Sequence, residues 1–147
     1  MEDNLIINLR PLLIHSLNET GFYDQAIDLI RVPALKSAFA KYLWMRGEHI
    51  VGIRSFLLRA NCKLSEFNFA NCPDPAAWEA FRQTINKHDT QALLRWGMQK
   101  GHVTLRKYES TLSHTAENKQ LSCMLDRHMK DIRTSLDNLS TLKFSFS

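Results

Sequence analysis

Mainly apolar residues recur at alternating steps of three and four positions through long stretches of this chain, and this spacing constrains the fold more than any other feature. In one stretch the face consists of Leu94, Met98, Gly101, Leu105, Tyr108 and Leu112. Such steps place residues on one side of an α-helix, which has about 3.6 residues per turn. Only five glycines and four prolines interrupt the sequence. We therefore expect a helical protein whose helices pack through these mainly apolar faces.

The pattern divides the chain into four long helices and one short helix. The long helices are predicted at about residues 4–31, 34–60, 89–113 and 118–142, and the short helix at 75–86. Pro33, Pro75 and Asp89 mark helix starts, because proline is tolerated in the first turn and aspartate caps a helix N-terminus. Pro11 lies inside the first range, so the first helix either begins near it or kinks there.

The lengths of the connections predict how the helices are arranged. Short links join the first long helix to the second and the third to the fourth, so each pair is expected to form an antiparallel hairpin. The 28 residues from Asn61 to His88 can span the length of a long helix, even with the short helix included. Residues 1–147 are thus expected to form a single all-α domain, a ferritin-like four-helix bundle with a long crossover between its second and third long helices.

Composition and charge exclude several classes of protein. The apolar runs are far shorter than the roughly 20 residues that cross a bilayer, and no secretory signal begins the chain, so we expect a cytoplasmic protein without membrane contact. The net charge of +4 permits anionic partners, but Lys and Arg are scattered along the sequence, which disfavours nucleic acid. The cysteines match no zinc spacing and are expected to be free thiols: Cys62, Cys72 and Cys123.

Short motifs spread over the chain resemble a known family. They are Phe22-Tyr23 followed by Ala26, Arg46, Trp78 with Asp89, Leu93-Leu94, and Tyr108. Over roughly residues 9–142 the chain is similar to uncharacterised bacterial ferritin-like four-helix-bundle proteins, a domain family of unknown function. The resemblance implies a fold more than an activity. The family tends to have Gly-Tyr in place of Phe22-Tyr23, and an acidic residue in place of Gly101, so a carboxylate role at the latter position does not carry over.

A di-iron site in such a bundle needs acidic residues that this sequence lacks. It takes a glutamate from each of two helices and a Glu-x-x-His motif from each of the other two. The chain instead offers Arg46-x-x-His49 and Leu125-x-x-His128, and Gly101 or His102 at a glutamate position. The metal-ligand positions are therefore degenerate.

Two further observations oppose a ferroxidase site. Glu19 and Asp24 lie beside the stripe of the first helix, so at most one of these carboxylates is expected to turn inward. Arg46 places a fixed positive charge on the inner face of the second helix, which raises the cost of bringing two cations there. We expect no di-iron chemistry.

Two histidines leave a smaller metal site open. His49 and His128 could hold one divalent transition-metal ion, with a shell completed by Glu48, Asp126 or Tyr23, because imidazole suits zinc, nickel or copper. The alternative is that both are core histidines bonded to each other or to nearby hydroxyl groups, those of Tyr42, Tyr108 or Ser135. A shared metal ion would require nitrogens of both rings within about 5 Å of each other, around one atom.

Three hypotheses for function follow. Sequence motifs of activated serines, phosphate loops and dinucleotide sites are missing, which favours a protein without enzymatic activity or cofactor. The first hypothesis is a non-catalytic bundle that forms a homo-oligomer or docks a protein partner through apolar residues off its main stripes: Trp44, Met45, Ile50, Leu57, Leu93, Trp96 and Val103. Alternatively, the short helix around Trp78 and Phe81 covers one of these faces. The second hypothesis is metal storage or redox chemistry at the two histidines, and the third is weak nucleic-acid binding.

Overall fold

A computed structural model describes the whole chain except residues 1, 61–74, 87–88 and 146–147. Its elements are α1 (Glu2–Ala26), the 3-10 turn η1 (Ile27–Leu29), α2 (Pro33–Arg59), α3 (Pro75–Asn86), α4 (Thr90–Thr115) and α5 (Lys119–Ser145). The all-helical prediction is confirmed, and four of the five predicted ranges agree with the helices to within three residues. The first part of the predicted crossover, with Cys62 and Cys72, lies outside the described residues.

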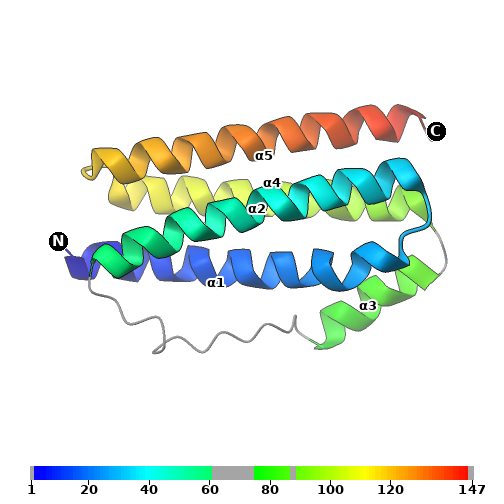
Figure 1. Ribbon diagram of the computed structural model, residues 1–147, viewed down its shortest axis with the longest axis horizontal. Helices are drawn as coiled ribbons and strands as arrows, with labels where there is room; N and C mark the ends of the chain where they lie inside the picture. The colour runs from blue at the N-terminus through cyan, green and yellow to red at the C-terminus, as the bar shows by residue number, and fades with distance from the viewer. Residues whose placement is uncertain (1, 61–74, 87–88, 146–147) are drawn as a thin grey trace.

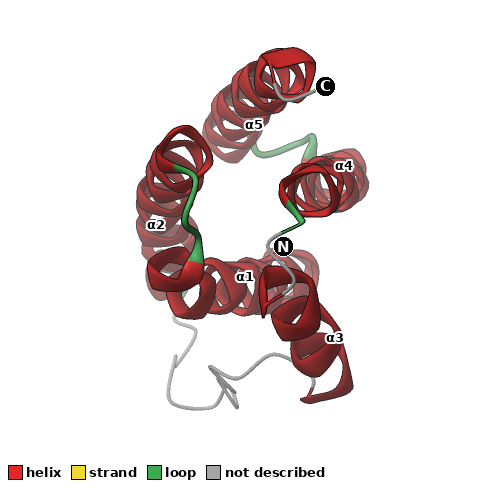
Figure 2. Cartoon of the chain, turned by 90° about the vertical axis from the view of Figure 1, so that its right-hand side faces the viewer, coloured by secondary structure: helices red, strands yellow, loops and turns green. Residues whose placement is uncertain are grey.

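The four long helices lie side by side, and each packs against two neighbours. α1 contacts α2 and α4, and α5 contacts the same two helices from the opposite side, while α3 lies outside against α1 and α4 (Figure 2). In Figure 1, α1 and α5 run towards one end of the molecule, and α2 and α4 run back. The two predicted hairpins, α1 with α2 and α4 with α5, are therefore present. α2 and α4 run in the same direction, as the long connection between them predicts.

The first helix differs from its predicted range of 4–31. α1 continues through the exposed Pro11, so the helix begins before the proline rather than near it. The α-helix ends at Ala26, and a single 3-10 turn follows. The chain must then leave the helix, because Val32 (φ −75°, ψ 115°) precedes Pro33 and is held in extended backbone. The prediction of a continuous helix to residue 31 is therefore wrong.

The short helix α3 covers an aromatic cluster at one end of the long helices. The Phe81 ring stacks on Trp96 with 4.0 Å between centroids, and Trp78 packs against Phe22 at 6.1 Å. Leu93, a further part of the wide apolar face of α4, is buried in the same cluster. The short helix α3 therefore covers the apolar face of α4, as the alternative to a docking surface predicted. None of the helices in the described part of the chain combines the length and hydropathy of a membrane span.

Gly101 lies where α4 approaches α5 closely. A Cβ atom added at Gly101 would be 2.5 Å from Cδ2 and 3.1 Å from Cγ of Leu136. The contact therefore favours a residue without a side chain. The sequence suggested a missing metal ligand at this position, whereas its neighbour in the structure is an apolar side chain.

Gly101→Ala is expected to lower the free energy of unfolding by up to about 2 kcal/mol, because an overpacking cost of about 1–3 kcal/mol exceeds the gain in helix propensity of about 1 kcal/mol. Urea denaturation followed by circular dichroism measures this loss. In a Leu136→Ala background the added methyl group has room, so the same substitution should be neutral or stabilising there. Equal losses in both backgrounds would show that Leu136 is not the obstacle.

Candidate functional site

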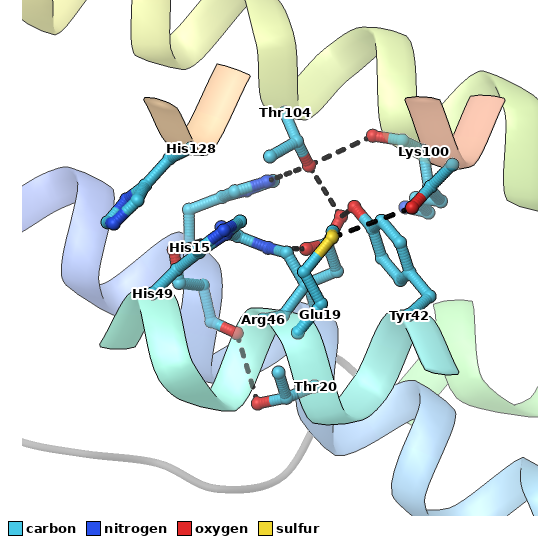
Figure 3. Close-up of polar contacts among 12 residues, drawn as sticks. His15, Glu19, Thr20, Tyr42, Arg46, His49, Lys100, Thr104 and His128 are labelled. Carbon is cyan, nitrogen blue, oxygen red and sulfur yellow. Dashed lines mark hydrogen bonds and ion pairs between the residues drawn. The ribbon is translucent and has the colours of Figure 1, made fainter. Parts of the chain in front are cut away.

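Polar side chains are buried at the centre of the four long helices, and we call this cluster the polar core. All four long helices contribute to it, and Figure 3 shows many of its side chains pointing toward one another. Arg46 of α2 lies in the middle, with no exposed side-chain surface. The buried members are Ser16, Glu19, Tyr42, Arg46, His49, Thr104, Tyr108 and His128.

The guanidinium of Arg46 finds partners on α1, α2 and α4. Its Nε donates to Oε1 of Glu19 at 2.8 Å, and its Nη2 donates to Oγ of Ser16. Its Nη1 donates to Oη of Tyr108 at 2.7 Å and to Nδ1 of His49 at 2.9 Å. Burial is the largest single influence on the pKa of Arg46 and lowers it, but the charge and hydrogen bond of Glu19, together with Tyr108 and Tyr42, outweigh burial, so the pKa lies above its ordinary value. The buried cation is therefore kept charged, and its hydrogen-bonding capacity is nearly filled.

The carboxylate of Glu19 is the counterion of this cluster. Its Oε2 accepts hydrogen bonds from Oη of Tyr42 at 3.0 Å and from Oγ1 of Thr104. Because Thr104 has only one hydroxyl proton, its oxygen accepts at 2.9 Å from Nε2 of His15. Asp24 is exposed, so the prediction that at most one of the two carboxylates turns inward is confirmed.

Hydrogen bonds decide where the protons of the two central histidines lie. Arg46 can only donate, so Nδ1 of His49 accepts, and Nε2 of His49 donates to Oδ2 of Asp131 at 2.9 Å. Tyr108 accepts from Arg46, and its own proton goes to Nδ1 of His128 at 3.0 Å. In this pattern both imidazoles are neutral and carry their proton on Nε2.

The neutral state also follows from the surroundings of the two rings. His49 and His128 stack with 3.9 Å between ring centroids and 18° between ring planes. Burial is the main reason that the pKa of His49 falls to about 4 and that of His128 to about 3. The nearby charge of Arg46 lowers both pKa values further.

The stacked pair does not fit a shared metal ion. An imidazole binds a metal through a lone pair in the plane of its ring. The planes of His49 and His128 are nearly parallel and meet only far beyond bonding distance, and each Nδ1 atom already accepts a hydrogen bond. Among the described residues, no three His, Cys, Asp or Glu side chains gather where they could hold a metal ion.

The other candidate ligands lie apart from the two histidines. Glu48 and Asp126 are exposed, and Tyr23 is buried among aromatic rings of α2 and α4. His49 and His128 do come together, which the sequence had left open, but the three candidates for completing their shell do not join them.

Sequence reasoning missed several side chains of the site, among them Asp131 and Thr104. Asp131, whose side chain is half exposed, bonds His49 from α5, and Thr104 bonds Glu19 from α4. Each follows a helical step, since Asp131 comes three residues after His128 and Thr104 four before Tyr108. The spacing places them on the right side of each helix, but it does not show which residue they meet.

Comparison of the chain with protein-family models, curated proteins and solved structures finds no match.

Proposed function

We propose that the protein is a non-catalytic, ferritin-like helical bundle that acts as a self-association module. Two hairpins with α2 and α4 running in the same direction support the ferritin-like assignment. In di-metal bundles of this kind, cations bind in the interior between the helices. Here the interior holds the Arg46 guanidinium, neutralised by Glu19, which leaves a structural role for the core.

The outward surface of α2 supports the self-association. Seven positions along it, at steps of three and four, are exposed and uncharged: Ser37, Ala40, Trp44, Gly47, Val51, Ser55 and Leu58. We call these residues the α2 face. Trp44, Val51 and Leu58 are 72%, 60% and 56% exposed. Helices pair through seams with this spacing, and a solvated helix surface ordinarily carries charges, so the α2 face is expected to meet a partner.

The α2 face is complementary to itself around Val51, and this favours a second copy of the chain as its partner. In an antiparallel pair of α2 helices with a two-fold axis at Val51, Trp44 of one copy lies opposite Leu58 of the other. Gly47 then lies opposite Ser55, and both are small. An added Cβ at Gly47 would meet no atom within 4 Å, so the surface at this position is open to a partner helix. The interface would be isologous, as in most homodimers.

Val51→Glu is expected to convert the dimer to a monomer, because two carboxylates would face each other at the two-fold axis. Sedimentation equilibrium should give about twice 17.0 kDa for the wild type and 17.0 kDa for the variant. Circular dichroism would check that the variant stays folded.

Ile7→Glu is the matched control for this experiment. Ile7 is 67% exposed and lies beside α4, away from the α2 face, so its substitution should leave the dimer intact. A wild type that sediments as a monomer at its highest soluble concentration would rule out the proposal. Equal dissociation in both variants would place the interface elsewhere.

A further inference from the structure

A groove lies between the C-terminal half of α2 and the N-terminal half of α5, with a volume of about 950 Å³. Four cationic side chains line it, with one acidic side chain among them: Arg59, Lys119, Arg127, Lys130 and the acidic Asp126. We call it the basic groove. The fold therefore brings together cationic residues that lie far apart in the sequence.

The cations of α5 form a row rather than a pocket. Lys119, Arg127 and Lys130 line the same groove along α5, and over those residues the helix rises about 16 Å. The row begins at Lys119, the first residue of α5, where the helix dipole adds positive potential. Such a row matches an extended chain with repeated negative charges better than it matches a single phosphate group.

The α2 side of the groove adds a surface for stacking. The guanidinium carbon of Arg59 lies 4.2 Å from the centroid of the Phe56 ring, and Arg59 is exposed. Planar bases stack on aromatic rings and on guanidinium planes. An acidic peptide would pair with the cations of the groove but would not use this stacking surface. The stacked Arg59 and Phe56 side chains therefore favour nucleic acid as the ligand.

We propose that the basic groove binds single-stranded nucleic acid. Its phosphates pair with Arg59, Lys119, Arg127 and Lys130, and a base stacks on Arg59 over Phe56. Binding through backbone charge and stacking is independent of base sequence and depends strongly on salt. Ser55 is the one residue of the α2 face that also lines the groove, whereas Val51 does not line it, so the Val51→Glu monomer should still bind RNA and RNA binding can be tested separately from self-association.

Fluorescence anisotropy with a labelled single-stranded RNA of about 12 nucleotides tests the proposal. Four phosphate contacts predict that the affinity falls about 50-fold between about 50 mM and about 200 mM salt. Arg127→Glu combined with Lys130→Glu should weaken binding at low salt by about tenfold or more, since two contacts become repulsive.

Arg95→Glu combined with Arg106→Glu is the control, because it makes the same change in net charge at exposed positions of α4. This variant should keep most of the affinity. Equal weakening in both double variants would overturn the assignment to the groove, and so would a wild type that does not bind RNA at low salt. A poly-glutamate peptide that binds as tightly as RNA would assign the groove to acidic peptides instead.

Discussion

Glu19→Ala is expected to lower the free energy of unfolding by about 3–5 kcal/mol, because it leaves a buried guanidinium without its counterion. Arg46 has no exposed side-chain surface and cannot lose its proton or reach water. The hydroxyl groups of Tyr42 and Thr104 lose their shared acceptor at the same time. Urea denaturation measures the loss. If the variant is too unstable to purify at room temperature, it is purified in the cold, and its melting temperature should then be lower than that of the wild type.

Two controls separate this effect from a general loss of side-chain contacts. Glu79→Ala breaks the Glu79–Arg82 ion pair on α3, whose side chains are both 50% exposed, and should cost less than about 1 kcal/mol. Glu19→Leu combined with Arg46→Met removes both buried charges, and it should be more stable than Glu19→Ala. If Glu19→Ala costs no more than Glu79→Ala, the ion pair in the polar core is not essential for stability.

Stability is expected to fall as the pH drops from about 6.5 to 3. In the unfolded chain a histidine titrates near pH 6.5, whereas the pKa of His49 is about 4 and that of His128 about 3 in the folded protein. Between these values the unfolded chain binds more protons, so stability is complete above about pH 6.5 and declines below it. For His49 alone the decline approaches about 3 kcal/mol. Urea midpoints at a series of pH values would follow it.

His128→Asn tests the origin of this decline. Asparagine does not titrate, and its side-chain oxygen can accept the hydrogen bond of Tyr108, so the variant should lose stability less steeply on acidification than the wild type. His102→Gln, at an exposed position of α4, should retain the slope of the wild type. His15, with a pKa lowered to about 4 mainly by burial, contributes in the same direction and keeps part of the slope in either variant. Parallel pH profiles for all three proteins would contradict a role for His128.

Helical periodicity was sufficient to predict most of the helices and the inner faces that carry Arg46, His49 and His128. The contacts between helices were harder to predict. The apolar pattern shows which residues share a face of one helix, but it does not give the position of those residues along the axis of a neighbouring helix. Glu19 looked peripheral to its own stripe, yet it is buried because Arg46 lies at the same height on α2. Gly101 looked like a lost ligand because its partner Leu136, in a different helix, was unknown.

The polar core also limits how the helices can slide along one another. A slip of α1 by one turn, about 5.4 Å, would bring His15 or Tyr23 opposite Arg46 in place of Glu19. Neither side chain supplies a negative charge, so each shifted pairing would leave the guanidinium buried and uncompensated. Apolar stripes alone tolerate such slips, since one leucine replaces another. The buried ion pair therefore selects a single axial register from the several that the apolar pattern allows.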